Sequence, residues 1–179
     1  MNTTSLSYTI YTATLEDVPA IRQMAVFTWW TVYPAILSAN QIEYMLDELY
    51  NEEILKEFIQ TEKQTFLILS EDDGPKGFAA YGPLPENDDI FKIYKIYVLP
   101  KNHSMGYGKA LLSKVADIAI EAGKKLLELN VNRNNPAKLF YERFGFKIIE
   151  EVDIPIGPFW MNDYVMQLDL DSIENKKPT

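Results

Sequence analysis

The chain contains no cysteine and only one histidine among its 179 residues. Disulfides, thiolate catalysis and cysteine metal sites are therefore excluded, and we predict no bound metal and a cytoplasmic location. No apolar run reaches the roughly 20 residues that a membrane-spanning helix requires, so we expect no membrane association. The first 11 residues are polar and lack the basic start and apolar centre of a signal peptide.

Positive charge is scarce, with 17 lysine and arginine residues against 26 acidic ones and a net charge of -9. Such a chain repels the backbone of nucleic acids, which we exclude as partners, and it suits a cationic substrate. The composition, 47% hydrophobic and 24% charged, is that of a soluble globular protein. We expect one domain over residues 1–179, with a folded core at 8–171 and a tail at 172–179.

The hydrophobic pattern predicts a mixed α/β fold. Helices and a hairpin fill the first half, and strands alternate with helices in the second half. The predicted helices cover residues 14–33, 38–50, 51–61, 106–122 and 136–144. The predicted strands cover residues 8–12, 65–69, 76–81, 90–99, 126–131, 146–152 and 161–168. This α+β order implies one central mixed sheet, part antiparallel and part parallel, with helices on both faces.

A glycine-containing turn joins a predicted strand to the helix that begins near Gly106. The N-terminus of such a helix presents unpaired N–H groups, and glycine allows a phosphate to approach them. Gly106 and Gly108 could equally serve only a tight turn. The nucleotide P-loop pattern is absent, and Leu111 stands where a dinucleotide fingerprint needs its third glycine. A nicotinamide enzyme is further disfavoured because only one strand–turn–helix unit is present.

Two segments resemble motifs of the GNAT superfamily of N-acetyltransferases. The stretch IYVLPKNHSMGYGKALL (residues 96–112) is similar to motif A, and NVNRNNPAKLFYERFGF (residues 130–146) is similar to motif B. The second segment keeps every spacing of the pattern N-x-x-A-x-x-x-Y-x-x-x-G-F. The resemblance implies the GNAT fold, acetyl-CoA as cosubstrate and an amine as acceptor.

The resemblance also implies roles for individual residues. The backbone at Ile96 and Val98 would hold the pantetheine arm and the acyl carbonyl, and Asn134 would contact the pantetheine. The Tyr141 hydroxyl would protonate the departing thiolate; helical spacing alone would make it a core aromatic. The N–H groups expected to bind the pyrophosphate belong to Met105, Gly106, Tyr107, Gly108 and Lys109.

Two positions depart from the family pattern. His103 replaces the usual Gln or Arg of motif A, and we interpret it as an exposed loop side chain. Tyr94 stands where many relatives carry a glutamate, so no general base can be named. A catalytically silent CoA-binding module is therefore an alternative. The nearby acids are interpreted as ordinary loop or surface residues: Glu86, Asp88, Asp89 and Asp163.

Aromatic residues before Pro34 suggest an acceptor site. Trp29, Trp30 and Tyr33, with Tyr44 and Tyr94, could surround an amine, although some could be plain core. The W-x-x-Y-P pattern and the later WMNDYVM segment are similar to bacterial GNATs of the spermidine/diamine branch. With the acidic 86–89 loop, they predict a small cationic amine such as a polyamine, ahead of an aminoglycoside or a protein amine. A homodimer is left open.

Overall fold

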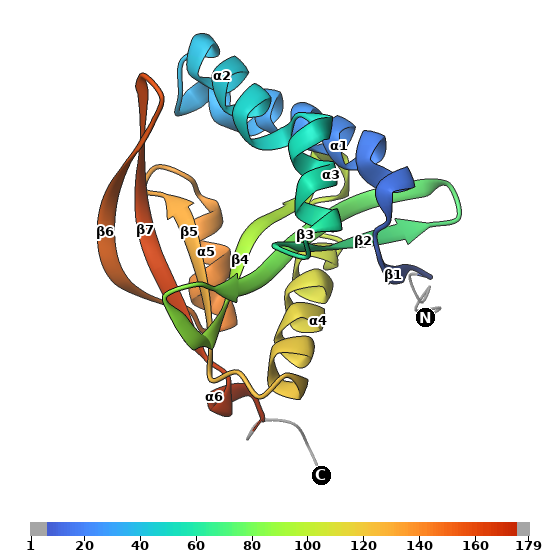
Figure 1. Ribbon diagram of the computed structural model, residues 1–179, viewed down its shortest axis with the longest axis vertical. Helices are drawn as coiled ribbons and strands as arrows, with labels where there is room; N and C mark the ends of the chain where they lie inside the picture. Colours follow the sequence, from blue (N-terminus) through green and yellow to red (C-terminus); the bar gives the residue numbers. More distant parts are fainter. Residues whose placement is uncertain (1–6, 175–179) are drawn as a thin grey trace.

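A computed structural model describes residues 7–174, which form a seven-stranded sheet with helices on both faces (Figure 1). The strand order is β1-β2-β3-β4-β5-β7-β6. The strands are β1 (Thr9–Thr12), β2 (Thr65–Glu71), β3 (Gly74–Leu84), β4 (Asn87–Val98), β5 (Leu126–Asn132), β6 (Lys147–Ile156) and β7 (Phe159–Asp169).

The helices follow the predicted pattern, with short 3-10 turns between them. The α-helices are α1 (Val18–Val32), α2 (Ala39–Tyr50), α3 (Glu52–Gln60), α4 (Tyr107–Glu121), α5 (Ala137–Phe144) and α6 (Asp171–Glu174). The 3-10 turns are η1 (Leu15–Asp17), η2 (Tyr33–Ala35) and η3 (Pro100–Asn102). Ser38 accepts a hydrogen bond from the Gln41 N–H and so caps α2, as its sequence indicates.

The sheet is mixed, because β4 and β5 pair in parallel while all other neighbours are antiparallel. Each face has its own hydrophobic core. Helices α1, α2 and α3 pack on one face against residues such as Phe66 and Phe78. Helices α4 and α5 cover the other face against residues such as Leu67 and Leu127. The predicted mixed sheet with helices on both faces is confirmed.

Several boundaries differ from prediction. Strand β3 runs beyond its predicted end at residue 81 and through Pro83, because the β3–β4 ladder is irregular there and tolerates a missing N–H. Thr14 caps η1 rather than α1. Helix α6 occupies the start of the expected tail, whose residues 175–179 lie outside the described range. Within residues 7–174, every helix is too short or too polar to cross a bilayer.

Candidate functional site

Strands β4 and β5 separate soon after they meet. They pair only from Ile90 with Leu126 to Ile93 with Leu129, although β4 continues to Val98 and β5 to Asn132. A bulge marks the point of separation: Ala80 of β3 faces Lys95 and Tyr81 faces Ile93, which leaves Tyr94 as the extra residue of β4. Because a bulge bends and twists its strand, β4 turns away from β5 at this position.

The separation leaves one edge of β4 without a neighbouring strand. The Leu99 N–H donates to the Lys76 carbonyl at 2.8 Å, so the peptide groups of Leu99 and Tyr97 face β3. Main-chain groups alternate sides along a strand, and those of Ile96 and Val98 therefore face the gap. The exposed His103 lies on this edge, with Nε2 2.9 Å from the Val98 carbonyl oxygen. The two residues predicted to bind through their backbone thus have no neighbouring strand on this side, and His103 is the contact at the Val98 carbonyl.

The start of α4 closes one end of the gap. Gly106 precedes the helix with φ of +83°, a conformation that favours glycine, and its carbonyl accepts the first helical bond from Ala110 at 3.0 Å. The N–H groups of Tyr107, Gly108 and Lys109 have no backbone acceptor among residues 7–174. Of the predicted pyrophosphate donors, the Met105 N–H is directed within the loop instead, toward the Asn102 carbonyl at 3.4 Å.

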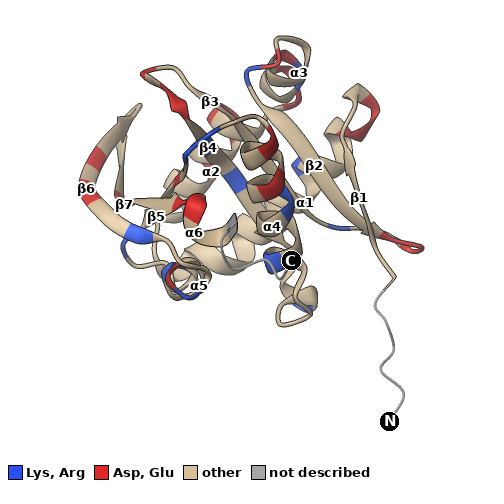
Figure 2. Cartoon of the chain, turned by 90° about the horizontal axis from the view of Figure 1, so that it is seen from below, with Lys and Arg blue, Asp and Glu red and all other residues tan. Residues whose placement is uncertain are grey.

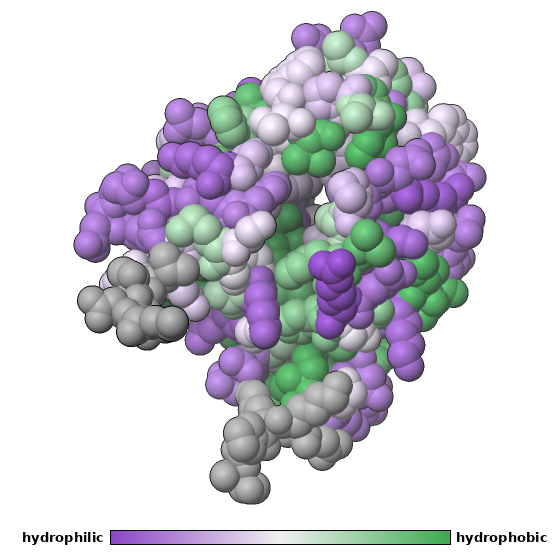
Figure 3. Space-filling view, turned by 180° about the vertical axis from the view of Figure 1, so that it is seen from behind, coloured by the Kyte–Doolittle hydropathy of each residue, from purple (hydrophilic) through white to green (hydrophobic). Residues whose placement is uncertain are grey.

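The separated strands line a cavity of about 1150 Å³ that extends from the α4 turn to α1 and η2. Figure 3 shows a hollow on the rear face, with hydrophobic side chains inside and hydrophilic ones around it. The cavity includes nearly every residue predicted from the sequence. Its lining contains Trp29, Tyr33, Tyr94, Ile96, Val98, Gly106, Tyr107, Gly108, Lys109, Asn134 and Tyr141.

Two of the predicted aromatic residues lie elsewhere. Trp30 is 39% exposed on α1 and is not among the residues that line the cavity, so the geometry gives its predicted substrate role no support. Neighbouring helical residues point about 100° apart, which is why Trp29 is buried and Trp30 is not. Tyr44 packs against Phe159 of β7, with ring centroids 5.5 Å apart.

The aromatic wall contains two tyrosines that sequence reasoning missed. Trp29 stacks on Tyr33 at a centroid distance of 4.4 Å and donates its Nε1–H to the Tyr97 hydroxyl at 3.2 Å. The Tyr50 hydroxyl donates to the same Tyr97 oxygen at 2.9 Å. Tyr50 is the last residue of α2 and Tyr97 follows Ile96 on β4, and the local sequence around either residue does not indicate a shared site.

Tyr141 lies on α5 between the α4 turn and the aromatic wall. Its ring contacts Phe140 and Phe146 edge-on, at centroid distances of 5.3 and 6.0 Å, and its side chain is 8% exposed. Burial raises the pKa of the Tyr141 phenol well above its ordinary value, and the nearby Tyr33 adds to the shift. The hydroxyl is therefore protonated at neutral pH and can donate a proton inside the cavity.

The Tyr94 hydroxyl donates to the Pro83 carbonyl at 3.0 Å, and burial raises its pKa, so it does not act as a base near neutral pH.

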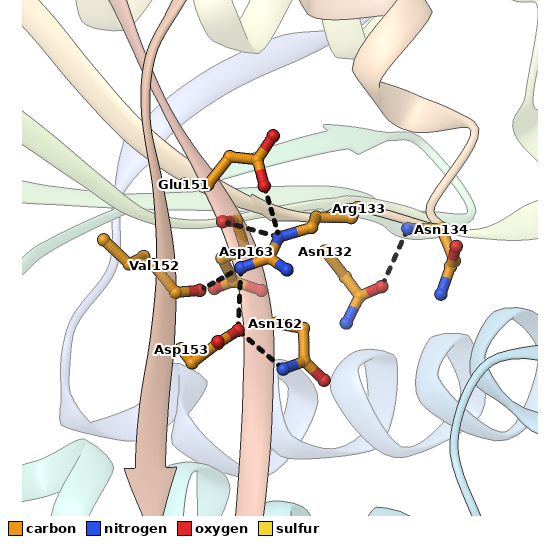
Figure 4. A network of polar contacts seen from close by, with 8 residues as sticks. All are labelled: Asn132, Arg133, Asn134, Glu151, Val152, Asp153, Asn162 and Asp163. Carbon is orange, nitrogen blue, oxygen red and sulfur yellow. Dashed lines mark hydrogen bonds and ion pairs between the residues drawn. The ribbon is translucent and has the colours of Figure 1, made fainter.

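Asn134 is exposed at the rim of the cavity, and its N–H donates to the Asn132 side chain at 3.0 Å (Figure 4). Lys95 is buried under α3, where burial lowers its pKa to about 7 and its Nζ donates to Gln64 at 3.0 Å.

Asp163 is not the surface acid expected from the sequence. It lies on β7 opposite Asn132 of β5, is 6% exposed, and is the only carboxylate among the described residues that line the cavity. Its Oδ1 has no hydrogen-bond partner within residues 7–174. Burial raises the pKa of Asp163, while the Asn130 amide and the charges of Arg133 and Lys92 oppose that shift.

The acidic segment at 86–89 was expected to be a loop, but Asn87–Asp89 form the start of β4, at the end opposite the cavity mouth. Asp88 pairs with Lys124 at 2.8 Å and Asp89 with Lys125 at 2.9 Å. Nine residues of strand, roughly 30 Å, separate Asp89 from Val98 at the mouth of the gap. In Figure 2 acidic residues are distributed over many elements rather than gathered at one opening. The loop therefore contributes no local charge to the cavity.

Asp163→Asn should stabilise the fold near neutral pH. Because the folded-state pKa of Asp163 is raised, its charged form opposes folding once the pH exceeds that pKa. We expect the melting temperature to rise by roughly 2–8 °C, as about 1–2 kcal/mol would produce in a domain of this size. The gain should shrink as the pH falls through the raised pKa and be gone below the ordinary Asp pKa, where both states are protonated. Thermal unfolding across acidic to neutral pH would measure it.

Asp153→Asn is the matched control, because the Asn162 amide and Arg133 lower the pKa of this exposed carboxylate. Its stabilising effect is present above the ordinary Asp pKa and is lost in acid, so the substitution should lower the melting temperature near neutral pH. A fall for both variants would show that Asp163 is satisfied in the fold.

Comparison with known proteins agrees with this geometry. The family model described as "Acetyltransferase (GNAT) family" matches residues 25–146. The uncharacterized N-acetyltransferase YuaI of Bacillus subtilis is 29% identical over 151 residues, covering 83% of this chain and 86% of that protein. The ribosomal protein bS18-alanine N-acetyltransferase of Haemophilus influenzae is 35% identical over 95 residues, covering 53% and 61%.

Solved structures give the same result. The structure of PaiA N-acetyltransferase from Thermoplasma acidophilum in complex with coenzyme A matches with a TM-score of 0.79 at 25% identity, covering 92% of this chain and 99% of that one. The matched range of the family model contains both the α4 turn and Tyr141.

Proposed function

Because the chain belongs to the acetyltransferase (GNAT) family, it is an acetyl-CoA-dependent N-acetyltransferase, and we propose that its acceptor is a small cationic amine such as a polyamine. One observation carries this proposal. A single cavity joins the α4 turn to the aromatic wall, with Tyr141 between them and one buried carboxylate at the acceptor side. Cosubstrate and amine can therefore meet without leaving the cavity.

The α4 turn has the chemistry that a pyrophosphate requires. Three N–H groups without backbone acceptors, those of Tyr107, Gly108 and Lys109, stand at the positive end of the helix dipole. A Cβ at Gly108 would approach Phe140 to 3.4 Å, so α4 and α5 meet closely at this point. The peptide edges of Ile96 and Val98 continue from this turn along β4, and they would hold the acyl carbonyl and the pantetheine arm.

Tyr141 would supply the proton that the reaction needs. Attack of a neutral amine on the thioester builds negative charge on the carbonyl oxygen and then on sulfur. The N–H groups of Ile96 and Val98 would stabilise the first charge, and the Tyr141 phenol would protonate the second. The proton that the amine nitrogen loses would return to the Tyr141 phenolate, which leaves the amide and the free thiol of CoA as products. The chain has no cysteine to carry the acetyl group, so we propose direct transfer in a ternary complex.

The acceptor side of the cavity is covered by a contact between distant segments. The β6–β7 turn meets α2, where a Cβ at Gly157 would overlap the Tyr44 side chain. Gln41 of α2 also donates to the Trp160 carbonyl at 2.8 Å. This contact restricts access for a folded protein substrate, and the rings of Trp29 and Tyr33 offer faces to an alkylammonium group. Both features favour a small amine.

Tyr141→Phe should lower kcat by roughly 100- to 10,000-fold, the usual contribution of a positioned general acid. The KM for acetyl-CoA should change little, because the ring and its contacts remain. Thiol release from acetyl-CoA measures both constants. Tyr81→Phe is the control, since Tyr81 has the same 8% exposure but does not line the cavity. Unchanged kcat for Tyr141→Phe at every pH would remove this residue from the chemistry.

A panel of acceptors tests the substrate class. With acetyl-CoA saturating, spermidine and diamines should be acetylated with higher kcat/KM than an aminoglycoside, a peptide N-terminus or a neutral amine. Preference for a peptide or a neutral amine would contradict the proposed acceptor and leave the acetyltransferase activity standing. Tight CoA binding without thiol release on any amine would instead identify the silent module.

A further inference from the structure

Asp163 is a buried carboxylate whose charge no neighbouring cation neutralises. It is 6% exposed, forms no ion pair through its side chain among the described residues, and has one oxygen without a partner. Burial of an unpaired carboxylate is costly, so proteins rarely keep one without a use for it. Because Asp163 lines the cavity, a cation bound beside it can supply the missing charge partner.

Arg133 is the nearest candidate cation, but it is directed elsewhere (Figure 4). Its guanidinium donates to the Asp153 carboxylate at 2.7 Å and to the Val152 carbonyl at 3.1 Å, and it lies 3.7 Å from Glu151. Its contact with Asp163 is a bond of 3.4 Å to the main-chain carbonyl. Two carboxylates of β6 therefore balance Arg133, and the Asp163 side chain gains only its more distant attraction.

The remaining groups around Asp163 are also occupied or uncharged. Lys92 of β4 pairs with Glu128 of β5 at 3.0 Å, which neutralises its charge. Asn130 of β5 faces Asp163, and the Tyr33 phenol of η2 lies close enough for the Asp163 charge to raise the pKa of Tyr33. A cation that entered this part of the cavity would meet one net negative charge.

The sheet places that charge away from the reacting bond. Asp163 lies on β7, which is separated by β5 from the β4 edge at Ile96 and Val98. Two strand spacings, roughly 10 Å, are the minimum distance between β4 and β7, and the separation of β4 from β5 increases it. An amine that reacts at the β4 edge is therefore too far away to be the group that Asp163 holds.

We propose that Asp163 binds a second, non-reacting ammonium group of the acceptor and so selects short diamines and polyamines over monoamines. This inference rests on the proposed acetyltransferase function and names the residue that determines its acceptor. The ammonium pairs with the Asp163 carboxylate, the aromatic wall contacts the alkyl chain, and the other amine reaches the thioester beside Tyr141. Asp163 is a specificity-determining residue and takes no part in proton transfer.

Acetylation of 1,4-diaminobutane and of butylamine by the whole protein tests the proposal, because the two differ in the second amino group. The wild-type kcat/KM should favour the diamine, mainly through KM. Asp163→Asn should raise the KM for the diamine at least about tenfold, which is the effect of losing a hydrogen bond between charged groups. The KM for butylamine should change little, because butylamine has no second amino group. The KM for acetyl-CoA should stay constant, which also shows that the variant is folded.

Asp153→Asn is the matched control, since it removes one negative charge beside the same Arg133 without touching the cavity. It should keep the preference for the diamine. The preference should also persist at high salt, because a buried pair is screened less than the attraction of a net charge of -9. Asp163→Glu should retain part of the preference for the diamine, because it keeps the carboxylate.

Equal use of both amines by the wild type, or an undiminished preference in Asp163→Asn, would overturn the inference while the acetyltransferase function stood. If neither amine is acetylated, calorimetric titration of the CoA-bound protein with 1,4-diaminobutane decides the question separately. Binding that Asp163→Asn weakens would support the role of Asp163 even as the proposed turnover of cationic amines failed. Absence of binding would overturn both the role of Asp163 and the proposed cationic acceptor.

Discussion

The site depends on the early end of pairing between β4 and β5. After four paired positions, the bulge at Tyr94 turns β4 aside, and the sheet divides while both strands continue. The division leaves the peptide groups of Ile96 and Val98 without a neighbouring strand, which would be costly in a closed core. It also opens a space between two hydrophobic cores, into which α4 directs its N-terminus. A continuous sheet would contain neither the cavity nor the unpaired edge.

The charges of this protein act at two different ranges. The net charge of -9 is spread over the surface, and the acidic loop near β4 is balanced by Lys124 and Lys125. Such charge affects encounter with a cationic substrate and is screened by salt. Within the cavity, by contrast, one unpaired carboxylate faces an aromatic wall. If the acceptor is a cationic amine as proposed, selection among amines would depend on this local arrangement more than on the acidic composition that first suggested such an acceptor.

Local sequence signals located one half of the site, and long-range topology made the other half. Gly106 and Gly108 were predicted from a turn and a helix start, which are read from contiguous residues, and Tyr141 was predicted from the resemblance to motif B. Asp163 could not be, since its burial depends on β7 entering the sheet next to β5, beyond the reach of local periodicity. Trp29 and Trp30 give a second example of this difference between local and long-range information. The adjacent tryptophans predicted that this helix contributes to the acceptor site, but the packing of the helix determined which of the two rings is buried.

Amide hydrogen exchange with and without CoA tests the central claim that the divided sheet and the α4 turn form one binding site. CoA should slow exchange at Ile96 and Val98, and at Tyr107 to Lys109, because these N–H groups gain acceptors only from the ligand. Exchange at Leu99 should change less, since its N–H already bonds to Lys76. Protection confined to other elements, with these amides unaffected, would contradict the account.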